Sequence, residues 1–121
     1  MYSFKVKGNI TCSHGVGASV FLMISDKKFA SSAKDSILYK SVNYNKKFTI
    51  QGHKEFNKKP ELHLQIRHIC IQPSSDNCLI KIFDFVIPPE NICKSGEKIK
   101  NWNFRNLDLA KPNITFEEKC V

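Results

Sequence analysis

Apolar and polar residues alternate with a period of two along much of this chain. In the first segment, every second residue from Phe4 to Cys12 falls on one face, while lysines, Asn9 and Thr11 fall on the other. The stretch from Leu62 onwards repeats the same alternation. This is the pattern of a half-buried antiparallel strand, with one face on a core and the other toward solvent. The sequence therefore predicts an all-β fold.

Residues that favour turns interrupt the alternation at short intervals, among them Gly15, Gly17 and the segment 73–77. Such breaks separate seven or eight short strands, and only Gly52–Lys59 indicates a helical turn. We therefore predict one domain over residues 1–121, a β-sandwich of antiparallel strands with Greek-key, immunoglobulin-like topology. The predicted strands are 4–12, 18–24, 37–42, 47–51, 62–70, 79–87, 102–109 and 114–119.

Length and composition agree with one globular domain. The chain has 121 residues, of which 41% are hydrophobic and 25% are charged. No apolar run approaches the roughly 18 residues that a transmembrane helix needs. The opening Met1–Val6 lacks the apolar region of a secretory signal. If the protein is secreted, we expect this sequence to be a mature form with an added or retained methionine.

Cysteine usage points to an oxidising compartment. Five cysteines in so short a chain are typical of a secreted protein. The sequence has no Cys-x-x-Cys motif, so a zinc site is not favoured. Two Asn-x-Thr sequons, at Asn9 and Asn113, also favour the secretory route. We predict a secreted, extracellular protein without a bound metal and with Asn9 and Asn113 as glycosylation sites.

Positions on the predicted strands suggest a disulfide arrangement without deciding it. Cys70 ends one strand and Cys78 begins the next, so the two would face each other across a hairpin loop. Cys12 and Cys120 would then join the two ends of the chain, leaving Cys93 as a free thiol. Other pairings remain open, because connectivity does not follow from sequence alone.

The chain is strongly basic, with a formal net charge of +8. Such a balance favours acidic partners, although it also serves solubility alone. The densest positive segment runs from residue 46 to residue 59, and we predict that it contacts an anionic surface. Its alternative interpretation is a solvated lysine face. The lysines of this predicted surface are Lys46, Lys47, Lys54, Lys58 and Lys59.

Several short motifs follow one another along nearly the whole chain. They are Val6–Cys12, Ser19–Leu22, Phe48–Gly52, Pro60–Leu64, Arg67–Cys70, Cys78, Val86–Pro88, Asn106–Leu109 and Cys120. In this order and spacing they resemble the nematode transthyretin-like family. This sequence departs from the family pattern at Ile69, Lys46 and Phe104-Arg105, so it resembles a divergent member.

The resemblance implies a transthyretin-like sandwich, secretion and a binding role. It suggests an adaptor that bridges phosphatidylserine on dying cells and an engulfment receptor. Two other functions stay open: a carrier of a small apolar ligand, and a secreted effector that binds proteins without lipid contact. Nucleic-acid binding is not expected, because aromatic and basic residues do not interleave on one face.

Catalysis is not predicted, and no cofactor is expected. The 5-hydroxyisourate hydrolase that shares the transthyretin-like fold has a C-terminal Tyr-Arg-Gly-Ser motif, whereas this chain ends with Glu118–Val121. His63 and Arg67 share a strand face but lie about 13 Å apart at the usual strand rise. They cannot act on one atom without groups from elsewhere.

A few single residues admit two interpretations. His68 faces inward beside Cys70, where we expect loop backbone to satisfy it, with a ligand or switch role as the alternative. Trp102, the only tryptophan, is expected to pack at a sheet edge. Phe21 and Met23 point away from the inward face of their strand, so they are either covered by protein or part of an exposed apolar patch.

Overall fold

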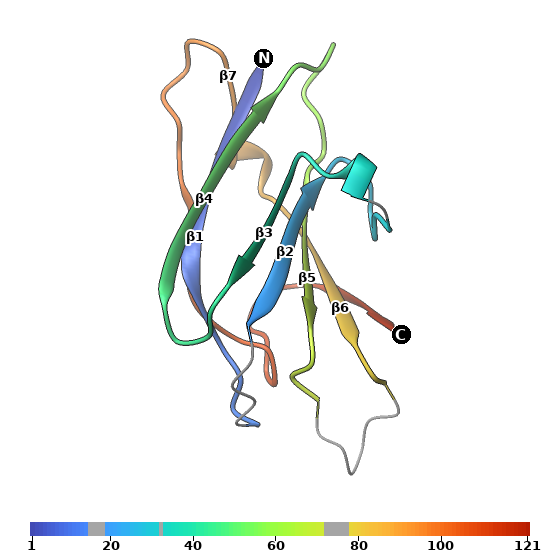
Figure 1. Ribbon diagram of the computed structural model, residues 1–121. Coiled ribbons are helices and arrows are strands. Elements are labelled where there is room, and N and C mark those ends of the chain that lie inside the picture. The colour runs from blue at the N-terminus through green and yellow to red at the C-terminus, as the bar shows by residue number, and fades with distance from the viewer. Residues whose placement is uncertain (15–18, 32, 72–77) are drawn as a thin grey trace.

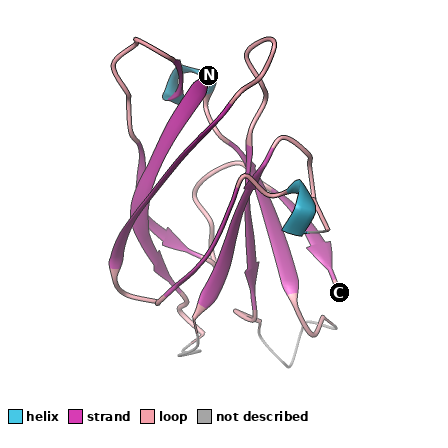
Figure 2. Ribbon diagram, turned by 45° about the horizontal axis from the view of Figure 1, so that its top comes forward, coloured by secondary structure: helices cyan, strands magenta, loops and turns pink. Residues whose placement is uncertain are grey.

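Two β-sheets face each other in the computed structural model, which describes residues 1–14, 19–31, 33–71 and 78–121. Figures 1 and 2 show the two layers and the loops at both ends. Among the described residues no helix has the length and apolar character to cross a bilayer. The strands are β1 (Tyr2–Thr11), β2 (Val20–Ser25), β3 (Leu38–Val42), β4 (Lys47–Lys54), β5 (His63–His68), β6 (Lys81–Val86), β7 (Ile92–Lys94), β8 (Trp102–Asp108) and β9 (Glu117–Cys120).

Strand β1 organises the first sheet. Along one edge it pairs antiparallel with β4. Its other edge is shared: β7 pairs with Tyr2 to Phe4, and β8 runs parallel to β1 from Val6 onwards. An irregularity in the β1–β8 register lies between Lys7 and Asn9, and Arg105 has a φ of 60° there. A bulge of this kind changes the direction in which side chains leave a strand.

The second sheet is antiparallel, in the order β3-β2-β5-β6-β9. The all-β sandwich predicted from the alternation is confirmed at this level. In β1 the side chains of Phe4, Val6 and Ile10 are almost wholly buried. In β2 the same holds for Val20, Leu22 and Ile24, whereas Ala18 lies outside the described residues. The inward faces of the two sheets form one apolar core.

The predicted strand boundaries need several corrections. Gly52–Lys59 holds no helical turn, because β4 continues through its first three residues. Two short 3-10 helices lie instead at Ala33–Asp35 and Pro89–Asn91. The three-residue strand β7 was not predicted, since it is too short to show an alternation. The breakers at 15, 17 and 73–77 lie outside the described residues.

The second sheet also buries part of its outward face, which the alternation does not indicate. His63, Gln65 and Asp84 are each 4% exposed, and Met23 is 8% exposed. Polar residues at alternate positions were expected to face solvent, but the loop after β2 folds back here. The backbone N–H of Phe29 in this loop donates to Asp84 at 2.9 Å. Of the two residues predicted to point outward on β2, Met23 is covered, whereas Phe21 remains exposed and stacks on Tyr39.

The predicted disulfide pairing is wrong. Cys12 bonds to Cys70, with their Cα atoms 5.8 Å apart, and Cys78 bonds to Cys120, at 5.3 Å. The register of β5 and β6 places His68 opposite Lys81. If this register is continued toward the loop, Cys70 lies opposite Leu79, which is one residue away from Cys78. A shift of one residue sends two side chains to opposite faces of a sheet, so these two do not meet.

The observed bonds follow from the sheet arrangement. Cys12 directly follows β1 of the first sheet and Cys70 lies just beyond β5 of the second, so their bond joins the two sheets. Cys120 ends β9 opposite Lys81 of β6, and Cys78 lies just before that strand. Cys93 is free, as predicted, and buried.

His68 lies in the core beside the disulfide that joins the sheets. Its Nδ1 accepts a hydrogen bond from the backbone N–H of Cys70 at 3.0 Å, so the predicted satisfaction by loop backbone holds for this one ring nitrogen. Its Nε2 is buried without a partner among the described residues, and its ring packs edge-on against Phe83. Burial, and secondarily the charge of Lys81, lower the pKa of His68 to about 4.

This shift predicts a specific loss of stability in acid. The unfolded chain protonates His68 near its ordinary pKa of about 6.5, while the folded protein does not until about 4. The contribution of His68 to the free energy of unfolding is therefore complete above about pH 6.5. It falls by about 3 kcal/mol as the pH drops to about 4.

The variant His68→Asn tests this prediction, because asparagine keeps an acceptor for Cys70 N–H but does not titrate. Urea unfolding of both proteins from pH 7 to pH 4 should show a shallower pH dependence in the variant, by about 3 kcal/mol. An identical pH dependence in the two proteins would contradict the assignment.

Candidate functional site

The five lysines predicted to form one anionic-surface site are divided between the two ends of β4. Lys46 and Lys47 lie where the strand begins, and Lys54 lies where it ends. At the usual strand rise, Lys47 and Lys54 are about 23 Å apart along the chain direction. Lys58 and Lys59 follow in the loop beyond Lys54 and line a shallow depression with Phe56 and Glu61. The predicted segment is therefore not one continuous surface.

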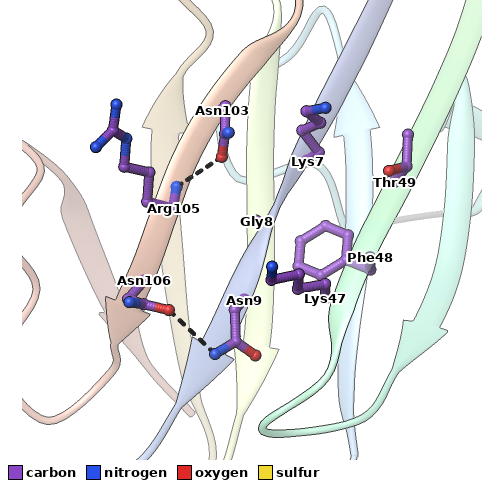
Figure 3. Close-up of a pocket in the computed structure, with 9 residues that line it drawn as sticks. All are labelled: Lys7, Gly8, Asn9, Lys47, Phe48, Thr49, Asn103, Arg105 and Asn106. Atoms are coloured by element: carbon purple, nitrogen blue, oxygen red, sulfur yellow. Dashed lines mark hydrogen bonds between the residues drawn. The ribbon is translucent and has the colours of Figure 1, made fainter.

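Lys47 instead joins a groove on the outer face of the first sheet, drawn in Figure 3. The groove has a volume of about 450 Å³. We call it the basic groove, because all the charged side chains that line it in the described part of the chain are cationic. Its lining residues are Lys7, Gly8, Asn9, Lys47, Phe48, Thr49, Asn103, Arg105 and Asn106.

The strand register explains why these residues meet. Lys7 lies between Thr49 of β4 and Asn103 of β8, and these three form one row across the sheet. The next row consists of Lys47, Asn9 and Asn106. Because side chains two residues apart share a face, both rows point outward.

The bulge in β8 adds a third cation to these rows. Arg105, at the bulge, donates its backbone N–H to Asn103 Oδ1 at 2.9 Å, and its guanidinium remains exposed. Lys7 and Arg105, which lie far from the predicted lysine segment in sequence, were therefore missed as site residues.

Positive charge dominates the outer face of the first sheet. Strands β1, β4 and β8 together contain a single carboxylate, Asp108, at the end of β8. Asp108 accepts hydrogen bonds from the backbone N–H groups of Ser13 and Ala110. Burial acts to raise the pKa of Asp108, but these hydrogen bonds outweigh it and the net pKa is lowered. Its charge is thus satisfied locally, and the cations of the basic groove face no carboxylate from these strands.

Amide side chains supply hydrogen-bonding groups between the cations. Asn9 Nδ2 donates to Asn106 Oδ1 at 3.1 Å, as the dashed line in Figure 3 marks. Asn9 Oδ1 is buried and has no partner among the described residues. Asn103 and Asn106 Oδ1 each accept one hydrogen bond within the protein, so each has one lone pair left for a polar ligand beside the cationic donors.

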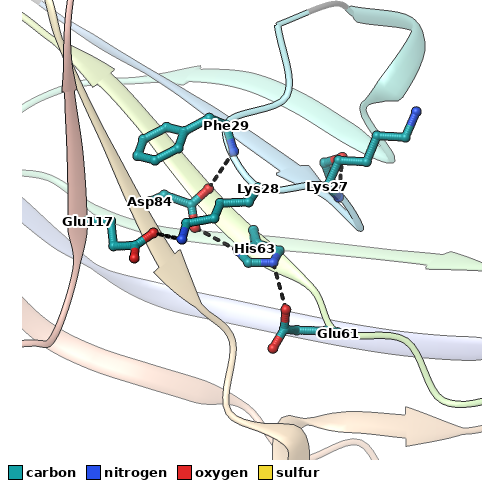
Figure 4. A network of polar contacts seen from close by, with 8 residues as sticks. Lys27, Lys28, Phe29, Glu61, His63, Asp84 and Glu117 are labelled. Atoms are coloured by element: carbon teal, nitrogen blue, oxygen red, sulfur yellow. Dashed lines mark hydrogen bonds and ion pairs between the residues drawn. The ribbon is translucent and has the colours of Figure 1, made fainter.

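A second polar cluster lies on the outward face of the second sheet, shown in Figure 4. His63 Nδ1 contacts Asp84 Oδ1 at 2.6 Å, and His63 Nε2 contacts Glu61 Oε2 at 3.1 Å. Lys28 forms an ion pair with Glu117 beside them. A carboxylate oxygen only accepts, so both His63 contacts are hydrogen bonds only when both ring nitrogens bear protons.

This cluster forms the polar end of a cavity of about 460 Å³. Trp102, half-buried against Phe104 as expected for a sheet-edge position, lines the same cavity. Arg67, which shares the strand face of His63, is exposed and does not line it. No signal in the sequence joined Glu61, His63 and Asp84, because Asp84 is 21 residues from His63 and lies in the neighbouring strand.

The remaining predicted residues have clear positions. Cys93 is buried, and its Sγ lies 3.5 Å from the backbone nitrogen of Lys100. Asn113 is exposed in the segment before β9, whereas Asn9 lies within β1. Among the described residues, no group of three or more His, Cys, Asp or Glu side chains could hold a metal ion.

Comparison of the chain with family models, with curated proteins and with solved structures finds no match to any of them.

We expect only one of the two sequons to be glycosylated. Asn113 is exposed, whereas the Asn9 amide is hydrogen-bonded to Asn106 within the sheet. When the protein passes through a eukaryotic secretory pathway, we expect Asn113→Gln to remove a glycan and Asn9→Gln to leave the glycan mass unchanged. Mass spectrometry before and after enzymatic deglycosylation measures this difference. A glycan on Asn9 would contradict the prediction and would also cover the basic groove.

Proposed function

We propose that this protein is a secreted binding protein that recognises anionic phospholipid on cell surfaces through the basic groove. Phosphatidylserine is the specific lipid proposed, and bridging to a cell-surface receptor is the proposed role. The observation that supports this function most directly is the cationic outer face of the first sheet. There Lys7, Lys47 and Arg105 lie together without an opposing carboxylate from β1, β4 or β8.

The groove cations supply part of the free energy that membrane association needs. Each basic residue near an anionic membrane contributes about 1 kcal/mol, so three groove cations contribute about 3 kcal/mol. Lys5 lies on the same face of β1, two residues from Lys7, and adds to this charge. Contacts of this kind weaken as salt rises, because exposed charges are screened over about 8 Å at physiological ionic strength.

Amides in the groove favour phosphatidylserine over other acidic lipids. Its headgroup combines a phosphate, a carboxylate and an ammonium group, so it needs acceptors as well as cations. The amide oxygens of Asn103 and Asn106 lie between the cations, and each accepts one hydrogen bond within the protein and has a second lone pair for a ligand. A headgroup with negative charge alone would leave these acceptors unused.

Extracellular location is supported by the covalent structure. Two disulfides link four of the five cysteines, and such bonds persist in oxidising compartments. The resemblance to secreted transthyretin-like proteins agrees with this location. The alternative of an apolar-ligand carrier between the sheets has less support, since large side chains such as Phe4, Phe85 and Leu107 fill the inward faces.

Liposome co-sedimentation tests the proposed function. Vesicles of neutral lipid alone, of neutral lipid with phosphatidylserine, and of neutral lipid with phosphatidylglycerol should be compared at low salt and at about 0.15 M salt. We expect binding to phosphatidylserine that persists at the higher salt and exceeds binding to phosphatidylglycerol. No sedimentation with any vesicle would contradict the proposal and favour a protein partner.

Two triple variants locate the contact. Lys7→Gln, Lys47→Gln and Arg105→Gln together remove the groove cations, and we expect a loss of about 100-fold in affinity. The matched control replaces Lys54, Lys58 and Lys59 by glutamine, which removes the same charge at the other end of β4. Equal losses in both variants would show a general basic surface and not a groove.

A further inference from the structure

The cavity at the second polar cluster exists because β9 covers only part of β6. Strand β9 pairs with β6 from Lys81 to Asp84, so no strand of the described residues pairs with Phe85 and Val86 on that edge. At this point the segment 114–117 lines a cavity of about 460 Å³ together with residues of β5, β6 and β8. A cavity of this size is adequate for a small organic ligand.

One side of the cavity is apolar and aromatic. Val86, Pro88, Trp102, Ile114 and Phe116 line it. Phe116 is held in place by ring contacts with core aromatics, at 4.5 Å from Phe83 and 5.9 Å from Phe85 between centroids. Trp102 and Phe116 thus offer ring surface to a ligand, and aromatic faces attract cations.

The other side of the cavity contains the buried contact between His63 and Asp84. The side chains of His63 and Asp84 are 5% and 2% exposed. Both carboxylate oxygens of Asp84 are in use, one with His63 and one with the N–H of Phe29. Asp84 is therefore a fixed structural anion that holds the imidazole with its Nε2 toward Glu61.

Two further carboxylates at the cavity mouth are accessible. Glu61 contacts His63 and is 69% exposed, and Glu117 contacts Lys28 and is 55% exposed. Among the described residues, the cavity lining has three carboxylates against Lys28 and His63, so negative charge is in excess even with a charged imidazole. This excess contrasts with the net charge of +8 on the whole chain.

We propose that this cavity binds a primary ammonium group attached to an apolar body, with the ammonium at Glu61 and Glu117 and the body against Trp102 and Phe116. An ammonium donates up to three hydrogen bonds and neutralises the excess charge. A ligand carboxylate would have to displace Glu61 from His63 or Glu117 from Lys28, and it would add to the excess of negative charge. The ammonium can belong to a free aromatic amine or to a lysine side chain of a protein. This site is independent of the basic groove.

Three probes with one apolar body and different head groups test the ligand class. They are 2-phenylethylamine, 2-phenylethanol and 3-phenylpropionate, and Trp102 fluorescence reports on binding because it is the only tryptophan. We expect the amine to bind about tenfold more tightly than the alcohol, and the carboxylate to bind more weakly still. Equal binding of amine and alcohol, tighter binding of the carboxylate, or no fluorescence change with any probe would overturn the proposal.

Single variants identify the carboxylates involved. Glu61→Gln and Glu117→Gln should each weaken amine binding by about fivefold to tenfold, with little effect on the alcohol. Glu118→Gln is the matched control, because Glu118 adjoins Glu117 but does not line the cavity. A loss in the control as large as in the other two would show a general charge effect and overturn the site.

A fourth probe, N-acetyl-lysinamide, distinguishes a free amine from a lysine side chain as the natural ligand. If N-acetyl-lysinamide binds as tightly as 2-phenylethylamine, the site recognises lysine side chains of a protein. If only the aromatic amine binds, the site holds a free small amine. Both outcomes support an ammonium site, and backbone amide NMR shifts at residues 114–117 confirm that binding occurs there.

Discussion

The apolar contact between the two sheets is the interaction on which the rest of this structure depends. Strand β1 contributes Phe4, Val6 and Ile10 to this contact, and it pairs with β4, β7 and β8 at the same time. The Cys12–Cys70 bond joins the two sheets covalently at one end of the contact. Because the core uses only inward faces, the outward faces are free to differ in chemistry.

That freedom produces two unlike surfaces on a small domain. The outer face of the first sheet is cationic, and its register places Lys7, Lys47 and Arg105 around one groove. The open edge of β6 in the second sheet has a carboxylate-rich cavity with an aromatic side. The proposed adaptor role requires separate contacts with a membrane and with a second partner, and two surfaces of opposite charge meet that requirement.

Much of the inward-facing set could be predicted, while the candidate sites could not. Alternation identified the inward-facing residues of β1 and β2, because side chains on one face of a strand recur with a period of two. The lysines from residue 46 to residue 59 are close in sequence, yet an eight-residue strand separates them into two groups. The buried positions of His63 and Asp84 were also missed, since they depend on a loop from elsewhere folding over them.

The sequence by itself determined the fold class, the number of cysteines, the inward faces and the excess of positive charge. These are local properties, set by residue type and by the repeat of the strand. Only the tertiary structure decided which cysteines pair, which cations share a groove and which acidic residues share a cavity. Each of these depends on the register between strands distant in sequence, and a change of one residue in register moves a side chain to the other face.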